Sequence, residues 1–473
     1  MKKTVICTIL IALALPGLAP AQEEAKVFKA GASITDITPW FGTSLAGGMS
    51  DRLANTVSDE THVRSIVLDD GTTQLAIALV DVCMIERPYL DAAKTRASAA
   101  TQIPTANMLV AATHTHSAGT CAHIFQSDAD PEYTALVTKR IADGITQAWL
   151  NRVPAKIGWG SASVPDEVFN RRWYMKEGGI GEDPFGKLDD QVKMNPPRAS
   201  ESLIRPAGPI DPEVAFLALE TVEGKPLALL ANYSLHYVGG APGVSADYFA
   251  VFANRIHGLL FERGAGHDFV GIMSNGTSGD INNIDFTKPA PEQKAGEQMM
   301  HVGNKVADAV YAQYGTFEFK DWVPLAAVQR EVTVGVRKPT PDEVDEAKAI
   351  LSAAEGRELQ GLREIYANCT VDLATFPDTE DIILQALQIG DLGIGAIPCE
   401  VFVEIGLAIK EQTPFGKSFT IELANGYNGY LPTEAQHALG GYETWRAKSS
   451  RLEVTAANVI QATVLELLGE LKP

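Results

Sequence analysis

The chain has 473 residues, with 59 acidic side chains against 39 basic ones and a formal net charge of −20 at pH 7. A surface this acidic repels polyanions, so we expect no nucleic-acid partner and no anionic membrane held by the overall charge. Hydrophobic residues make up 45% of the chain, which is enough to bury a sizeable core.

The first residues have the pattern of a secretory signal peptide. Lys2 and Lys3 precede an apolar run over residues 5–15, and small residues up to Ala21 form a cleavage site. We therefore predict a signal peptide over residues 1–21 and a secreted or periplasmic protein; the alternative is an uncleaved membrane anchor. No later apolar run approaches the roughly 20 residues that span a bilayer, so no transmembrane segment is expected after cleavage.

Cysteine usage is modest, and Cys7 would leave with the signal peptide. Export permits disulfides, and the four remaining cysteines allow three pairings. No C-x-x-C pair occurs, which argues against a cysteine zinc cluster. The remaining cysteines are Cys83, Cys121, Cys369 and Cys399.

Strand and helix patterns alternate along the first two thirds of the chain. Such alternation predicts an α/β fold with a mixed, largely buried sheet flanked by helices. Asp70-Gly71 between the first two strands indicates a hairpin. In chain order the predicted elements are strands 63–68 and 74–80, helix 89–100, strand 107–112, helix 132–150, strand 226–231, helix 249–261, strand 269–273 and helix 293–314.

Two regions depart from this alternation. Residues 177–209 are rich in glycine, proline and charge, which predicts a long surface excursion that could serve as a lid over a site. From about residue 320 the chain shows a strand pattern over 323–336 and helix patterns over 340–353 and 454–468. We expect an α+β extension here, either a second subdomain or a continuation of the same sheet.

The first candidate site is the His-x-His sequence of His114 and His116, directly after the apolar strand 107–112. Side chains two residues apart on extended chain point to the same side, and imidazole is a common zinc ligand. A lone H-x-H is more often two hydrogen-bonded loop histidines. Its place at the end of a buried strand favours function, because ligand sites in α/β sheets lie outside the carboxyl ends of strands.

Three further polar segments also follow apolar strands. They are Asn232–His236, residues 274–283 and Cys399-Glu400. Taken singly, His236 would be a core histidine, residues 274–283 a capped turn and Glu400 a helix-starting carboxylate. The chain has no H-E-x-x-H, G-x-S-x-G, P-loop or G-x-G-x-x-G motif, which argues against standard metalloproteases, serine α/β-hydrolases and nucleotide enzymes.

Together these segments resemble the neutral/alkaline, non-lysosomal ceramidase family. Gly31–Pro39, Ala112–Ser117 and the block Leu423–Glu443 carry the resemblance, in the order of the family's motifs. Each motif alone is weak, but together they span nearly the whole mature chain. The resemblance implies that residues 22–473 form the family's N-terminal catalytic domain.

The resemblance also implies a site, residue by residue. His114 and His236 match the zinc-binding histidines, Glu400 the carboxylate ligand and Tyr430 the tyrosine ligand. Two imidazoles, a carboxylate and a phenolic oxygen make a plausible Zn²⁺ shell, although other divalent ions also fit.

The same match implies catalytic residues around that shell. His116 matches the proton-transfer histidine and Tyr442 the tyrosine that stabilises an oxyanion. Arg171 matches an active-site arginine, with Arg172 as its rival. Without the resemblance, the tyrosines and arginines would be read as loop packing and surface charge.

Two departures bear on the substrate. Asn282 stands where the family has a serine, and we expect the family's further C-terminal β-sandwich domain to be absent. We predict a secreted zinc-dependent hydrolase that cleaves an N-acyl amide bond of a small-molecule or lipid substrate with metal-activated water. The alternatives are an esterase, lactonase or carbohydrate-directed hydrolase on the same fold, or a non-catalytic lipid- or sugar-binding relative. The oligomeric state is open.

Overall fold

The computed structural model describes residues 1, 3–4 and 26–472. The predicted signal peptide lies almost wholly outside these residues and stays a prediction. Among the described residues, no helix combines the length and the apolar character needed to cross a membrane. The four cysteines beyond the signal region are buried free thiols, so none of the three pairings forms.

The larger of two main sheets has eight strands in the order β12-β11-β10-β5-β1-β2-β3-β4. The β3–β4 and β11–β12 pairs are parallel and the other neighbouring pairs antiparallel, so the sheet is mixed, as predicted. Its strands are β1 (Lys29–Asp36), β2 (His62–Asp69), β3 (Gln74–Val80), β4 (Met108–Ala112), β5 (Val153–Ser163), β10 (Glu213–Thr221), β11 (Pro226–Tyr233) and β12 (Val270–Asn275).

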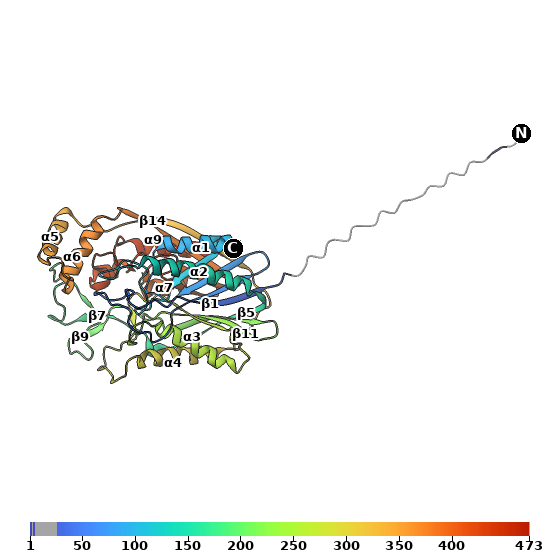
Figure 1. Cartoon of the computed structure of the whole chain (residues 1–473), viewed down its shortest axis with the longest axis horizontal. Helices are drawn as coiled ribbons and strands as arrows, with labels where there is room; N and C mark the ends of the chain where they lie inside the picture. The colour runs from blue at the N-terminus through green and yellow to red at the C-terminus, as the bar shows by residue number, and fades with distance from the viewer. Residues whose placement is uncertain (2, 5–25, 473) are drawn as a thin grey trace.

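Four helices cover one face of this sheet. Helices α1 (Arg87–Thr101) and α2 (Pro131–Leu150) pack on the β1–β4 half, and α3 (Asp247–Phe261) and α4 (Glu297–Gln313) on the β10–β12 half. In Figure 1, α1 and α2 lie above strands β1 and β5 and α4 lies below them, because the sheet that carries both pairs on one face is curved. Helix α4 begins later than predicted because Gly296, with a φ of 75°, turns the chain just before it.

The other face of the larger sheet packs on a second sheet rather than on helices. Its strands, in the order β14-β15-β16-β18, come from the C-terminal third, and the two sheets share one apolar cluster. Helix α9 covers its outer face. The elements are β14 (Leu325–Gly335), β15 (Thr379–Ile389), β16 (Leu392–Ile397), β18 (Lys417–Glu422), α5 (Pro341–Ala353), α6 (Gly361–Ala374), α7 (Val403–Gln412) and α9 (Ala456–Leu471).

Strand β10 shows how one strand of the larger sheet is buried on both faces, by helices on one face and by the second sheet on the other. Alternate residues enter the cluster beneath α3 and α4 and the cluster shared by the two sheets, and both sets are apolar. A strand buried on both faces needs such a continuous apolar run. The first set is Val214, Phe216 and Ala218; the second is Ala215, Leu217 and Leu219.

Short strands, a short helix and 3₁₀ turns lie along the edge where the strands of the two main sheets end. The predicted excursion 177–209 is partly ordered as strand, because β8 and β9 pair with β7 in a small sheet. The short elements are β6 (Phe169–Asn170), β7 (Arg172–Met175), β8 (Val192–Met194), β9 (Leu203–Pro206), β13 (Ile281–Asn282), β17 (Glu400–Val401), β19 (Tyr430–Leu431), α8 (Glu434–Ala438) and the 3₁₀ turns Thr105–Asn107, Pro165–Glu167 and Tyr442–Thr444.

Curvature brings the two edges of the larger sheet together. Strands β12 and β4 stand at opposite ends of the hydrogen-bonding order, yet they contact each other. The chain beyond β18 also reaches this place, where the Asn425 N–H donates to the Val110 carbonyl at 2.7 Å. Polar segments that follow β4, β11, β12, β16 and β18 therefore meet on one side of the molecule.

Candidate active site

The three side chains predicted to bind a metal through nitrogen or carboxylate oxygen converge where these segments meet. His114 follows β4, His236 follows β11, and Glu400 begins β17 just after β16. The His114 Nε2 lies 3.0 Å from the His236 Nε2 and 3.3 Å from the Glu400 Oε2. The His236 Nε2 lies 4.0 Å from the same oxygen. All three side chains are buried.

Backbone carbonyls fix the orientation of the histidine rings. The Nδ1 atoms of His114 and His236 lie 2.8 Å and 3.2 Å from the carbonyl oxygens of Cys83 and Ser278. A carbonyl can only accept, so each Nδ1 carries a proton and each neutral ring keeps its lone pair on Nε2. With both rings neutral, two lone pairs would face each other 3.0 Å apart, so the geometry calls for a positive charge between them, either a proton on one ring or a metal cation.

Glu400 also points an oxygen at this place, one without a hydrogen-bond partner among the described residues. Its Oε1 accepts a hydrogen bond from the Tyr427 hydroxyl at 3.0 Å, whereas its buried Oε2 has no hydrogen-bond partner in the described part of the chain. Zinc bonds of about 2.0–2.1 Å in a tetrahedron place ligand atoms roughly 3.3 Å apart. The observed separations of 3.0 Å to 4.0 Å fit such a shell.

The electrostatics also favour one positive charge at this point. Burial lowers the pKa of His236 well below its usual value. Burial acts in the same sense on His114, but the neighbouring Cys83 and Glu400 outweigh it and raise the pKa of His114. In Glu400, burial would raise the pKa, yet His114 more than offsets it and lowers the pKa of the carboxyl. The cluster therefore attracts a cation.

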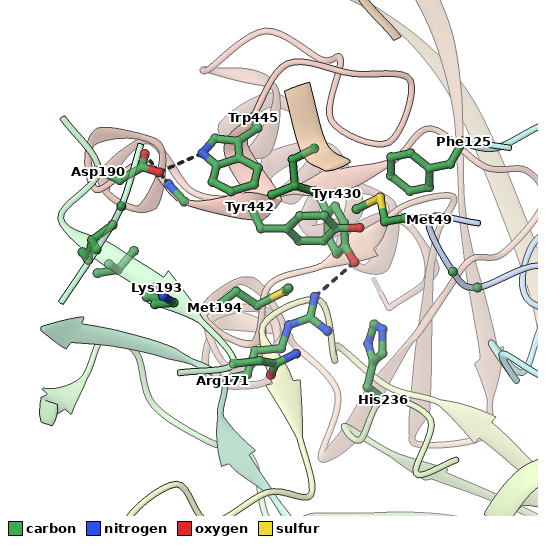
Figure 2. Close-up of a pocket in the computed structure, with 18 of the residues that line it drawn as sticks. Met49, Phe125, Arg171, Asp190, Lys193, Met194, His236, Tyr430, Tyr442 and Trp445 are labelled. Carbon is green, nitrogen blue, oxygen red and sulfur yellow. Dashed lines mark hydrogen bonds between the residues drawn. The ribbon is translucent and has the colours of Figure 1, made fainter. Parts of the chain in front are cut away.

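Tyr430, the predicted fourth ligand, lies beside Glu400. Strands β17 and β19 pair in parallel, with Glu400 opposite Tyr430. The Tyr430 hydroxyl oxygen accepts a hydrogen bond from the Arg171 Nη2 at 3.1 Å, as the dashed line in Figure 2 shows. The structure thus brings all four predicted ligands together.

The structure also distinguishes the two candidate arginines. Arg171 faces the pocket and holds three acceptors, namely Tyr430, the Gly279 carbonyl at 2.8 Å and Glu443 at 2.9 Å. Arg172 is fully buried, donates to the other oxygen of Glu443 and does not line the pocket. The sequence did not single out Glu443, which joins the two arginines.

His116 lies at the pocket side of the cluster. Its Nδ1 is 2.9 Å from the Gly47 carbonyl, and its Nε2 is 3.2 Å from the His114 Nε2. The two rings converge, but not because the chain is extended: His114 has a φ of 73°, in the left-handed region. Tyr237, which the sequence analysis missed although it follows His236 directly, stacks on His116 with ring centroids 3.7 Å apart. Burial lowers the pKa of His116 well below its usual value.

A cavity of about 470 Å³ opens over these groups. In Figure 2, Tyr430 and Tyr442 lie near the centre of the view, with Arg171 and His236 below them and Met49 and Phe125 to one side. The predicted excursion forms part of its wall. The lining residues are Gly47, Gly48, Met49, His116, Phe125, Arg171, Ile180, Gly181, Glu182, Asp190, Val192, Lys193, Met194, Asn195, His236, Tyr237, Leu362, Tyr430, Gly441, Tyr442 and Trp445.

Asn282, by contrast, does not line this cavity. Its Oδ1 accepts from the Ile284 N–H at 3.0 Å, and its Nδ2 donates to the Asn195 Oδ1 at 2.6 Å. Because the Ile284 N–H can only donate, the Asn282 amide orientation follows from that bond. Asn195, which does line the cavity, therefore turns its carbonyl oxygen toward Asn282 and its amide nitrogen away.

Comparisons of sequence identify no relative. No protein-family model matches the chain, and no curated protein matches it either. The fold, in contrast, matches solved structures.

One is the neutral ceramidase from Pseudomonas aeruginosa, with a TM-score of 0.68 and 15% identity over 94% of this chain and 74% of that one. Another is a ceramidase complexed with C2, with a TM-score of 0.70 and 16% identity over 94% of this chain and 75% of that one. The chain therefore has a neutral-ceramidase-like fold, as the motifs predicted.

Proposed function

We propose that this protein is a secreted zinc-dependent hydrolase that cleaves the N-acyl amide bond of a ceramide-like substrate. The observation that carries the proposal is the convergence of the His114 Nε2, the His236 Nε2 and an unpartnered Glu400 oxygen beside Tyr430. Similarity in fold to neutral ceramidases supports the choice of an amide.

His114, His236, Glu400 and Tyr430 would hold the zinc ion. When bound, zinc supplies Lewis-acid chemistry, lowering the pKa of water toward neutrality and polarising a carbonyl. Arg171 would keep Tyr430 directed at the site, because its guanidinium donates to the phenolic oxygen and is itself anchored on Glu443 and Gly279.

His116 would transfer the proton of the reaction. Its Nδ1 donates to Gly47, which leaves the Nε2 lone pair facing the ligand cluster at the pocket. In amide hydrolysis, water gives its oxygen to the acyl carbon and a proton to this nitrogen. The C–N bond then breaks, and His116 returns the proton to the leaving amine nitrogen.

Tyr442 would stabilise the oxyanion that forms on the acyl oxygen. Burial raises the pKa of its hydroxyl, so the group stays protonated and able to donate. Within the described residues, that hydroxyl has no hydrogen-bond partner of its own, and the side chain lines the cavity. Asn282 would act through Asn195, whose amide nitrogen it leaves free to bind a polar group of the substrate.

The lining suggests where the acyl chain would lie. Met49, Phe125, Leu362 and Trp445 give the cavity an apolar side. Glu182 and Lys193 also line it, which favours a second candidate: an ester, lactone or sugar N-acyl substrate more polar than ceramide, hydrolysed by the same residues.

The test combines metal analysis with hydrolysis on one purified sample. We expect near-stoichiometric zinc and cleavage of a short-chain fluorescent ceramide, both lost in His114→Ala. The matched control is His123→Ala, since His123 is an exposed histidine that pairs with Asp128 instead. Zinc with cleavage only of the matching ester would favour the second candidate, and a zinc-free wild-type protein would exclude both.

A further inference from the structure

Behind the predicted ligands lies a carboxylate that none of the proposed catalytic steps uses. Glu422 is the last residue of β18, and its side chain is 0% exposed. Carboxylates are rarely buried this completely unless their oxygens are hydrogen-bonded. The partners of Glu422 therefore indicate what it does.

All three hydrogen bonds to Glu422 come from neutral donors on two segments. The Ser278 hydroxyl donates to Oε1 at 2.6 Å. The backbone N–H groups of Ser278 and Val401 donate to Oε2 at 3.2 Å and 2.7 Å. A backbone N–H cannot reverse its role, so Oε2 must act as an acceptor for both segments at once.

Each of the two segments carries a predicted metal ligand. Val401 directly follows Glu400, and the Ser278 carbonyl accepts the Nδ1 proton of His236 at 3.2 Å. The segments also touch directly, since the Gly279 N–H donates to the Val401 carbonyl at 2.8 Å. A Cβ on Gly279 would lie only 2.6 Å from the Glu400 carbonyl oxygen, so this approach requires glycine.

We propose that Glu422 is a positioning residue for the metal centre, whose three hydrogen bonds hold Glu400 and His236 at the separation that a divalent cation requires. The proposal rests on the proposed function, because it presumes that these residues bind zinc. Groups that orient metal ligands from behind commonly change metal affinity by 10–100-fold when removed.

A purely structural role would give a different result. Loss of packing lowers the stability of the zinc-free protein and leaves the intrinsic zinc affinity unchanged. Loss of positioning weakens zinc binding and reduces the rise in melting temperature that zinc produces. Both quantities need only the purified full chain and zinc itself, without any substrate.

The experiment measures the zinc dissociation constant by competition with a chromophoric chelator, together with melting temperatures with and without zinc. We expect Glu422→Ala to bind zinc about 10–100-fold more weakly than the wild-type protein. Glu422→Gln should stay within about threefold, because its amide oxygen still accepts from both N–H groups and its NH₂ can donate to the Ser278 hydroxyl oxygen.

Two further variants keep the test decisive. Ser278→Ala removes the 2.6 Å bond to Glu422 and the longer 3.4 Å contact of the hydroxyl with the His236 Nδ1, but keeps the carbonyl that orients His236. A loss of about threefold to tenfold is expected even if Glu422→Ala does not fold. Glu404→Ala is the matched control: this carboxylate accepts from Thr433 and Gln436 and contacts no predicted ligand. It should bind zinc as the wild-type protein does.

Wild-type zinc affinity in Ser278→Ala or Glu422→Ala would overturn the proposal. So would a loss in Glu422→Gln as large as that in Glu422→Ala, since the charge rather than the hydrogen bonds would then matter. A wild-type protein that binds no zinc would instead overturn the proposed function itself.

Discussion

The inner and outer walls of the pocket differ in how firmly their side chains are held. On the inner wall, formed by His116, Arg171, His236, Tyr430 and Tyr442, most side chains are fixed by hydrogen bonds: Arg171, 4% exposed, has three acceptors. The outer wall consists mainly of apolar side chains from loops, from the end of β8 and from the start of α6, namely Met49, Phe125, Ile180, Met194 and Leu362. Side chains that must be placed to within a fraction of an ångström for the reaction are expected on the inner wall. Side chains that accept substrates of different shape are expected on the outer wall.

The largest effect is expected from Tyr442→Phe. Removing one oxyanion donor costs roughly 10²–10³-fold in kcat, because that hydrogen bond forms only in the transition state. KM for a short-chain fluorescent ceramide and the zinc content should stay near the wild-type values. Steady-state kinetics and metal analysis on the same preparation measure all three quantities.

Tyr89→Phe provides the control for this variant, since Tyr89 is a partly buried tyrosine on α1 outside the pocket. If kcat of Tyr442→Phe were unchanged, Tyr442 would belong with the tolerant outer wall and the contrast between the walls would fail. If zinc were lost together with kcat, Tyr442 would be acting on the metal site instead.

A stability measurement tests how the interior away from the pocket tolerates a charge. Lys94 on α1 is 2% exposed, and its Nζ donates to the Asn425 Oδ1 at 2.5 Å. Burial lowers the pKa of Lys94 to about 8. Between this value and the unfolded pKa of about 10.4, only the unfolded state keeps the proton, so the unfolding free energy rises with pH.

Lys94→Met lacks this titration. The unfolding free energy of the wild-type protein minus that of the variant should rise by about 3 kcal/mol between about pH 7 and pH 11. Chemical denaturation of both proteins across this range gives the difference, in which the other titrating groups cancel. A difference independent of pH would show that Lys94 keeps an ordinary pKa, and hydrolysis should be unaffected because Lys94 lies outside the pocket.

Much of the fold followed from local sequence patterns. Helices α1 and α2 begin within two residues of their predicted starts, because their apolar spacing and flanking prolines are local signals. The pairing between the two sheets was not predictable in this way. It depends on contacts such as Asn425 with Val110, which lie 315 residues apart in the sequence.

For the site, too, local patterns were predictable and long-range contacts were not. Four predicted segments meet because each follows a strand, and the ends of those strands share one edge of the fold. The choice between Arg171 and Arg172 stayed open because adjacent residues face opposite ways along a chain, and only the tertiary structure shows which one faces the pocket. Glu422 had no local signal, since its partner Ser278 is 144 residues away.

The smallest effect is expected on the outer wall, from Met194→Ala and Leu362→Ala. Leu362 is 41% exposed, so each substitution removes only partly buried methylene and methyl groups, each worth up to about 0.8 kcal/mol. We expect KM for a long-chain N-acyl substrate to rise about threefold to tenfold with kcat unchanged, and no change with a short-chain substrate. Leu188→Ala is the control, because Leu188 lies on the same excursion, is 72% exposed and does not line the pocket. Equal effects on both chain lengths would mean that the acyl chain does not reach the outer wall, and a fall in kcat would mean that this wall helps to place the reacting atoms.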